Sequence, residues 1–185
     1  MEDSVKPDLR PDGEHQLPTE QYKYAIMLDF AKRFNLTTYV ETGTCEGYSL
    51  KAVSPYFKES YSIELSPEYY QKAVDHFKDN KTVHLIRGDS AVELKKLLAT
   101  IPDASILFYL DAHFSGGQTV GSGSSPLRKE LTAIFDSGVN GIIIIDDCID
   151  YRHDGVLEEA IQVVSEFSEW DQNVKHGLMR IWRKA

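Results

Sequence analysis

Hydrophobic and polar positions along the chain follow two alternating periodicities. Short runs that are apolar or alternate with polar residues predict five strands, over 37–41, 60–65, 82–87, 105–110 and 141–146. Segments with apolar residues three and four positions apart predict helices, over 19–34, 46–56, 66–78, 91–99, 126–137 and 154–167. A weaker strand pair is predicted over 173–183, interrupted at His176-Gly177. Strands that alternate with helices indicate βαβ units, so we expect an α/β fold with a doubly wound, mostly parallel sheet and helices on both faces.

Several local signals support this pattern. Thr19 follows Pro18, and Ser66 precedes Pro67, so each is placed to cap the start of a helix. Asp89 or Ser90 is expected to cap the helix over 91–99. The strand over 105–110 is almost wholly apolar, which is typical of a parallel strand buried on both faces.

The chain has 185 residues, which fits one domain with a sizeable core, and we expect residues 19–185 to form it. Residues 1–18 are polar and carry three prolines, so they are interpreted as a tail or an ordered arm. This segment lacks the apolar core of a secretory signal. No apolar run approaches the roughly 20 residues that a membrane span needs.

Charge and cysteine content narrow the range of partners. The formal net charge is −9 and no cluster of lysine or arginine stands out, which disfavours a nucleic-acid substrate. Cys45 and Cys148 each follow a predicted strand. This usage favours thiols in a reducing compartment, and hence a cytoplasmic protein, although two strand ends at one sheet edge could also come close enough for a bridge.

The carboxyl ends of parallel strands indicate where function should lie, because ligands of such sheets bind there. This rule selects residues 41–47, 64, 88–90, 111–113 and 146–148. In the first segment the strand ends in Glu41 and breaks into a glycine turn that opens a helix. Glycines allow close approach of the backbone to a ligand. A carboxylate at this point would repel a phosphate but suits an ammonium group.

Together these segments resemble the class I S-adenosylmethionine-dependent methyltransferases. Residues 41–47 resemble the acid-x-Gly-x-Gly-x-Gly motif of that family, with Cys45 in place of the middle glycine. Glu64 stands 23 residues after Glu41, where the family has an acid on the ribose hydroxyls. Gly88-Asp89-Ser90 resembles the adenine-contacting motif, and Asp111 the fourth motif, beside the transferred methyl group. The resemblance covers residues 37–147, and the weak last strands fit the family's antiparallel terminal hairpin.

The resemblance implies S-adenosylmethionine (SAM) as cofactor. The implied cofactor-binding residues are Glu41, Gly43, Thr44, Gly47, Ser49, Glu64, Leu65, Gly88, Asp89, Ser90 and Asp111. The expected reaction is methyl transfer to an oxygen or nitrogen nucleophile of a small molecule. Asp111 and His113 are the candidate catalytic residues, with His113 as general base because a histidine titrates near neutrality. A structural or exposed role for His113 stays open.

Residues 110–117 and 145–147 also resemble small bacterial methyltransferases and the metal-dependent O-methyltransferases. That similarity implies a magnesium ion held by Asp111, Asp146 and Asp147. Three carboxylates brought together are costly without a cation, and oxygen ligands suit magnesium. Alternatively, Asp146 and Asp147 act as caps or pair with Arg152 or His153.

Two other functions compete with methyl transfer. An NAD(P)-dependent oxidoreductase on a Rossmann sheet fits less well, because Glu41 and Glu46 flank the turn where a pyrophosphate would lie. A catalytically silent SAM-binding domain would keep Gly43 and Glu64 without needing Asp111 and His113. The segments available to recognise an acceptor are short, so we expect a small molecule, or a site completed by a second subunit in a homo-oligomer.

Overall fold

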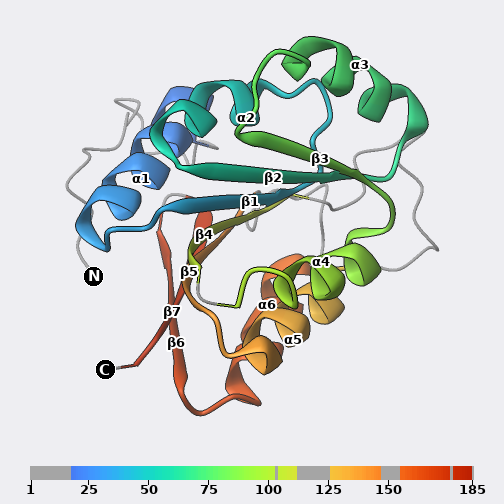
Figure 1. Ribbon diagram of the computed structural model, residues 1–185. Coiled ribbons are helices and arrows are strands. Elements are labelled where there is room, and N and C mark those ends of the chain that lie inside the picture. The colour runs from blue at the N-terminus through green and yellow to red at the C-terminus, as the bar shows by residue number, and fades with distance from the viewer. Residues whose placement is uncertain (1–17, 103, 112–125, 147–154, 176, 185) are drawn as a thin grey trace.

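The computed structural model describes residues 18–102, 104–111, 126–146, 155–175 and 177–184. These residues form a seven-stranded sheet in the order β3-β2-β1-β4-β5-β7-β6 (Figure 1). The strands are β1 (Thr38–Thr42), β2 (Glu59–Glu64), β3 (Val83–Arg87), β4 (Ser105–Leu110), β5 (Asn140–Ile145), β6 (Trp170–Lys175) and β7 (Leu178–Arg183). Strands β1 to β5 are parallel to one another, whereas β7 runs antiparallel to both β5 and β6. The predicted parallel sheet and its antiparallel terminal hairpin are both confirmed.

Helices cover both faces of the sheet (Figure 1). They are α1 (Glu20–Arg33), α2 (Tyr48–Val53), α3 (Pro67–Phe77), α4 (Ser90–Leu98), α5 (Leu127–Ser137) and α6 (Val156–Ser165). One apolar cluster joins α1, α2 and α3 to one face, and a second joins α4, α5 and α6 to the other. Along β4, Leu107 and Tyr109 pack in the first cluster while Ile106, Phe108 and Leu110 pack in the second. Burial on both faces explains why this strand is nearly all apolar.

The predicted helix starts are confirmed by their hydrogen bonds. The Thr19 hydroxyl accepts from the Tyr22 backbone N–H (3.2 Å), and the Ser66 hydroxyl accepts from that of Tyr69 (3.4 Å). Of the two candidates for α4, Asp89 is the cap, and its carboxylate accepts from Ala91 N–H (2.9 Å). Each cap satisfies a donor that the first helical turn leaves without a partner.

Some boundaries differ from the prediction. The helix predicted over 46–56 begins only at Tyr48, because Gly47 is left-handed (φ 73°), and continues after Val53 as the 3₁₀ turn η1 (Ser54–Tyr56). Pro55 lacks the N–H needed to continue an α-helix, which explains the change. Strand β6 begins at Trp170, three residues before the predicted start of the hairpin at 173. Trp170 is buried against Phe135, so tertiary packing extends a weakly strand-forming sequence.

Among the described residues, no helix combines the length and the apolar composition of a membrane span. Residues 1–17 of the predicted tail, the glycine- and serine-rich loop over 113–125 and His176 lie outside the described residues. The division into a tail and a single domain over 19–185 stays a prediction.

Candidate active site

The strand ends selected from the sequence lie next to one another along one edge of the sheet. Backbone N–H groups at the strand ends donate to carbonyl oxygens of neighbouring strands. The pairs are Gly43 to Ile63 (2.9 Å), Gly88 to Glu64 (2.9 Å), Asp111 to Thr42 (3.1 Å) and Asp146 to Leu110 (3.2 Å). This edge therefore brings together the segments after β1, β2, β3, β4 and β5, as predicted.

The turn after β1 has the backbone shape of a glycine-rich ligand loop. Gly43 and Gly47 have φ values of 87° and 73°, and Cys45 has φ 47°. Cys45 thus adopts a left-handed conformation at the position where the methyltransferase motif has a glycine. For a residue with a side chain this conformation costs about 1–3 kcal/mol. Its thiol is free and exposed, whereas Cys148 lies outside the described residues.

Glu41 lies beneath this turn and is fully buried. Its carboxylate accepts hydrogen bonds from the hydroxyls of Tyr39 (2.8 Å), Ser49 (2.8 Å) and Ser62 (2.6 Å). Thr44 shares a hydrogen bond with Ser62, so the turn, β1 and β2 meet in one network. Burial raises the pKa of Glu41 to about 7, although the three hydroxyl donors oppose the rise.

Glu64, at the end of β2, is the second acid of this half of the site. One carboxylate oxygen accepts from the Cys45 N–H (2.8 Å) and the other from the Ser66 N–H (2.7 Å). The residue is 5% exposed. A carboxylate offers about four lone-pair sites, so these two bonds fix its orientation and leave it able to accept more.

The segment after β3 completes this half of the edge. Asp89 caps α4, and Ser90 in the first turn is buried. A side chain at Gly88 would collide with Glu93, since an added Cβ would lie 2.6 Å from its Cγ. Leu65, also predicted to contact the cofactor, follows Glu64 with 38% of its surface exposed.

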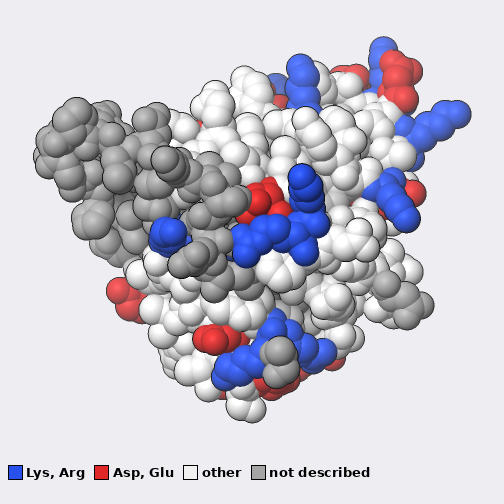
Figure 2. All heavy atoms as spheres, turned by 90° about the vertical axis from the view of Figure 1, so that its left-hand side faces the viewer, with Lys and Arg blue, Asp and Glu red and all other residues white. Residues whose placement is uncertain are grey.

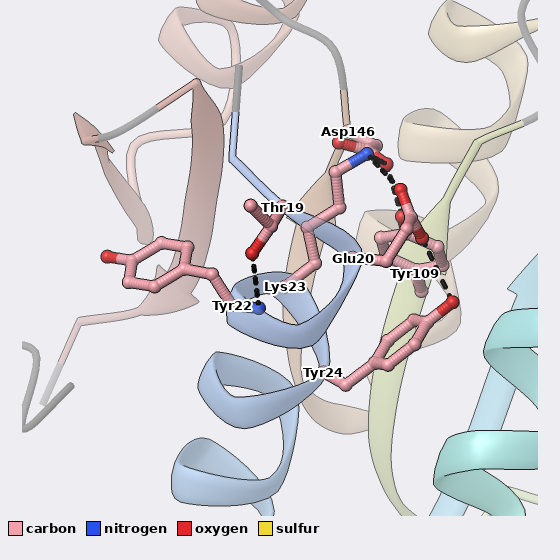
Figure 3. A network of polar contacts seen from close by, with 7 residues as sticks. All are labelled: Thr19, Glu20, Tyr22, Lys23, Tyr24, Tyr109 and Asp146. Atoms are coloured by element: carbon pink, nitrogen blue, oxygen red, sulfur yellow. Dashed lines mark hydrogen bonds and ion pairs between the residues drawn. The ribbon is translucent and has the colours of Figure 1, made fainter. Parts of the chain in front are cut away.

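The other half of the edge, at the ends of β4 and β5, is built around a buried ion pair (Figure 3). Lys23 of α1 places its Nζ 2.6 Å from Oδ2 of Asp146, and the Tyr109 hydroxyl donates to the same oxygen. The side chains of Lys23 and Asp146 are 7% and 2% exposed. The Lys23 Nζ also lies 3.1 Å from Oε1 of Glu20. The other carboxylate oxygen of Glu20 accepts a hydrogen bond from the Tyr24 hydroxyl (2.9 Å). The sequence offered Arg152 or His153 as partners of Asp146; those residues lie outside the described ones, and the described partner is Lys23.

Of the three predicted magnesium ligands, Asp146 lies in surroundings that do not suit a metal ion. Asp146 is held by an ammonium group, Asp111 is half-buried at the end of β4, and Asp147 lies outside the described residues. Within the described ranges, no group of three or more His, Cys, Asp or Glu residues could hold a metal. The triad stays a prediction, as does the catalytic role of His113, which is also outside the described residues.

The sequence analysis did not select the polar residues that hydrogen-bond to the site acids, namely Tyr39, Ser62, Lys23 and Tyr109. Two of them, Lys23 and Tyr109, nevertheless carry a recognisable signal. Lys23 stands three, four and seven positions before Ile26, Met27 and Phe30, so it lies on the apolar stripe of α1. Tyr109 is the only hydroxyl in the apolar run 106–110. A polar group at a core position generally requires a buried partner, and both residues have one in Asp146.

The described part of the face in Figure 2 carries lysine and arginine in separate groups with acidic residues beside them. They do not merge into one basic stripe on that face. This distribution agrees with the acidic net charge.

No protein-family model matches the sequence, and no curated protein matches it. Solved structures do resemble it. A Podospora anserina methyltransferase with bound S-adenosylhomocysteine (SAH) is 19% identical, with a TM-score of 0.69 over 95% of this chain and 83% of that one. An O-methyltransferase from Bacillus cereus in complex with SAH is 12% identical, with a TM-score of 0.69 over 92% and 84%. The N-methyltransferase NodS from Bradyrhizobium japonicum is 14% identical, with a TM-score of 0.58 over 89% and 96%. At these identities the likeness establishes the fold, so the chain has the Rossmann-like fold of SAM-dependent methyltransferases.

Proposed function

We propose that this chain is a SAM-dependent methyltransferase that methylates an oxygen or nitrogen nucleophile of a small molecule. The fold supports the proposal because neighbours that share it carry SAH, the product of such a reaction. The site supports it because the acids predicted to meet the cofactor lie at one edge of the sheet. Neighbours described as O-methyltransferase and N-methyltransferase share the fold, so the fold leaves the acceptor atom open.

The observation that carries the proposal is the arrangement around Glu64. Its carboxylate is buried, oriented by two backbone N–H groups, and placed between the glycine turn and the start of α3. Further acceptor capacity on a fixed carboxylate suits the two neighbouring hydroxyls of a ribose. Within the described residues, neither Glu41 nor Glu64 forms an ion pair with a lysine or arginine. The Glu64 carboxylate is therefore available to attract a cationic ligand such as a sulfonium that carries an ammonium group. Glu41, whose pKa is raised to about 7, is only partly ionised at neutral pH.

The same features count against the nicotinamide alternative. The common dinucleotide-binding sheet has the order 3-2-1-4-5-6. Here antiparallel β7 lies between β5 and β6, as in the terminal hairpin that the resemblance predicts. Two acids under the turn would also repel a pyrophosphate.

In the proposed reaction the sulfonium supplies an activated methyl group, and the protein aligns donor and acceptor. Glu64 holds the ribose, and the backbone over 88–90 borders the adenine. The turn over 43–47 faces the amino-acid end. The fixed backbone bond between Asp111 and Thr42 keeps the end of β4 next to this turn. Positioning of this kind lowers the barrier by removing the entropy cost of encounter. His113 is the proposed base for the acceptor proton.

Calorimetry with SAH and with NAD tests the proposal. We expect SAH to bind and NAD not to bind, and we expect Glu64→Gln to weaken SAH binding. Glu68→Gln, at an exposed position in the first turn of α3, is the matched control and should bind as the wild type does. Transfer of a labelled methyl group to catechols, sugars or amines then separates an enzyme from a silent binding domain. Binding of NAD without binding of SAH contradicts the proposal.

A further inference from the structure

Helix α1 delivers a positive charge to the acid after β5. Lys23 lies on the buried face of α1, and its side chain extends to the carboxyl end of β5, where it meets Asp146 (Figure 3). The contact joins residues 123 positions apart in the sequence, so it depends on the tertiary fold and not on local structure. Both side chains are withdrawn from water.

The two charges depend on each other. A buried carboxylate without a cation is strongly destabilising, and so is a buried ammonium without an anion. Tyr109 adds a hydroxyl donor to the same carboxylate oxygen, and Glu20 adds a second carboxylate to Lys23. The carboxylate is therefore already neutralised and hydrogen-bonded by the chain itself.

A divalent ion at Asp146 would compete with this arrangement. The ion and the Lys23 ammonium would be like charges on one carboxylate, in a region where water screens them little. Either the metal stays away or Lys23 loses its partner while buried. The second outcome carries the cost of an uncompensated buried charge.

We infer that the Lys23 ammonium takes the place at Asp146 that a divalent metal ion would need, and that methyl transfer in this chain proceeds without a metal on Asp146. Where it concerns the reaction, this inference rests on the proposed methyl transfer. Lys23 and Asp146 are positioning residues. Their contact holds α1 against the end of β5, which lies beside the end of β4. In this chain the positive charge beside Asp146 therefore comes from the Lys23 side chain, whereas in metal-dependent O-methyltransferases it would come from a metal ion.

Manganese binding tests this inference without requiring catalysis. Mn²⁺ accepts oxygen ligands as magnesium does and can be followed by its paramagnetic signal. The purified wild-type chain and Asp146→Asn are titrated with Mn²⁺ in the absence of SAM. We expect no binding to the wild type, or binding that Asp146→Asn leaves unchanged. Binding that this substitution weakens by about tenfold or more, as loss of a ligand would, overturns the inference.

A crystal of the wild type soaked in Mn²⁺ gives a second answer that does not depend on folding of a variant. We expect Lys23 to remain on Asp146, with no anomalous peak at bonding distance from that carboxylate. A peak there, with Lys23 displaced, overturns the inference. If SAH fails to bind in calorimetry, the proposed function is wrong. The conclusion about Mn²⁺ at Asp146 is unaffected, because it is measured without SAM or SAH.

Discussion

The two halves of the sheet edge hold their acids in different ways. At the ends of β1 and β2, Glu41 and Glu64 are held by hydroxyl and backbone N–H donors, with no cation among the described residues. At the ends of β4 and β5, Asp146 is paired with the Lys23 ammonium. Hydrogen bonds orient a carboxylate without cancelling its charge, and burial raises the pKa of Glu41 to about 7, whereas an ammonium cancels the charge of Asp146. The first half therefore keeps two acids without a described cation, and the second is internally neutralised at Asp146.

The largest expected effect is on stability and comes from Lys23. Lys23→Met leaves Asp146 buried without its cation, and we expect a loss of about 3–5 kcal/mol in the free energy of unfolding. Urea denaturation measures this loss. Lys32→Met, at an exposed position in the same helix, is the control and should change stability little. Adding Asp146→Asn to Lys23→Met should recover part of the loss, since it removes the uncompensated charge. Equal stability of Lys23→Met and the wild type would show that the pair does not neutralise a buried acid.

Glu41 should make stability depend on pH. Its pKa is raised from 4.5 to about 7, so the folded state holds a proton that the unfolded state releases between these values. Stability from this group is therefore present below about pH 4.5 and is lost as the pH rises through about 7. Relative to Glu41→Gln, the wild type should lose roughly 2–3 kcal/mol between about pH 5 and about pH 8. Denaturation of both proteins across this range measures it, and parallel pH profiles would contradict the assigned burial of the charge.

Glu64 should affect ligand binding. Glu64→Gln removes the charge and replaces one of the two oxygens that accept from backbone N–H groups with an NH2 group. We expect SAH affinity to fall by about 10–100-fold, the range for a hydrogen bond to a charged group. Calorimetry against Glu68→Gln separates this effect from a general change in surface charge. Unaltered SAH affinity would move the ribose site away from the end of β2.

The smallest expected effect is at Cys45. Cys45→Gly relieves a left-handed residue but increases the freedom of the unfolded chain, so we expect a gain of about 1 kcal/mol or less. Cys45→Val should lose stability, because a branched side chain fits this conformation poorly. Thermal melting of the pair measures both changes. Greater stability of the valine variant would argue against the left-handed turn.

The sequence predicts the order of elements well because alternating strands and helices leave strong periodic signals. The 105–110 strand and the Ser66 cap show this. The rule that ligands meet strand ends selected the acids at 41 and 64, and their contact with a cofactor stays a prediction. The Lys23–Asp146 contact could not be predicted in the same way. Lys23 is visible as a polar residue on an apolar stripe, but its partner depends on how α1 crosses the sheet, and no local pattern encodes that. The start of β6 at Trp170 likewise depends on packing against Phe135.

A crystal structure of the chain with SAH would locate the ribose site directly. We expect the ribose hydroxyls of SAH within hydrogen-bond distance of the Glu64 carboxylate, with the turn over 43–47 against the amino-acid end. SAH bound elsewhere, or bound with Glu64 making only its contacts to Cys45 and Ser66, would show that Glu64 does not hold the ribose.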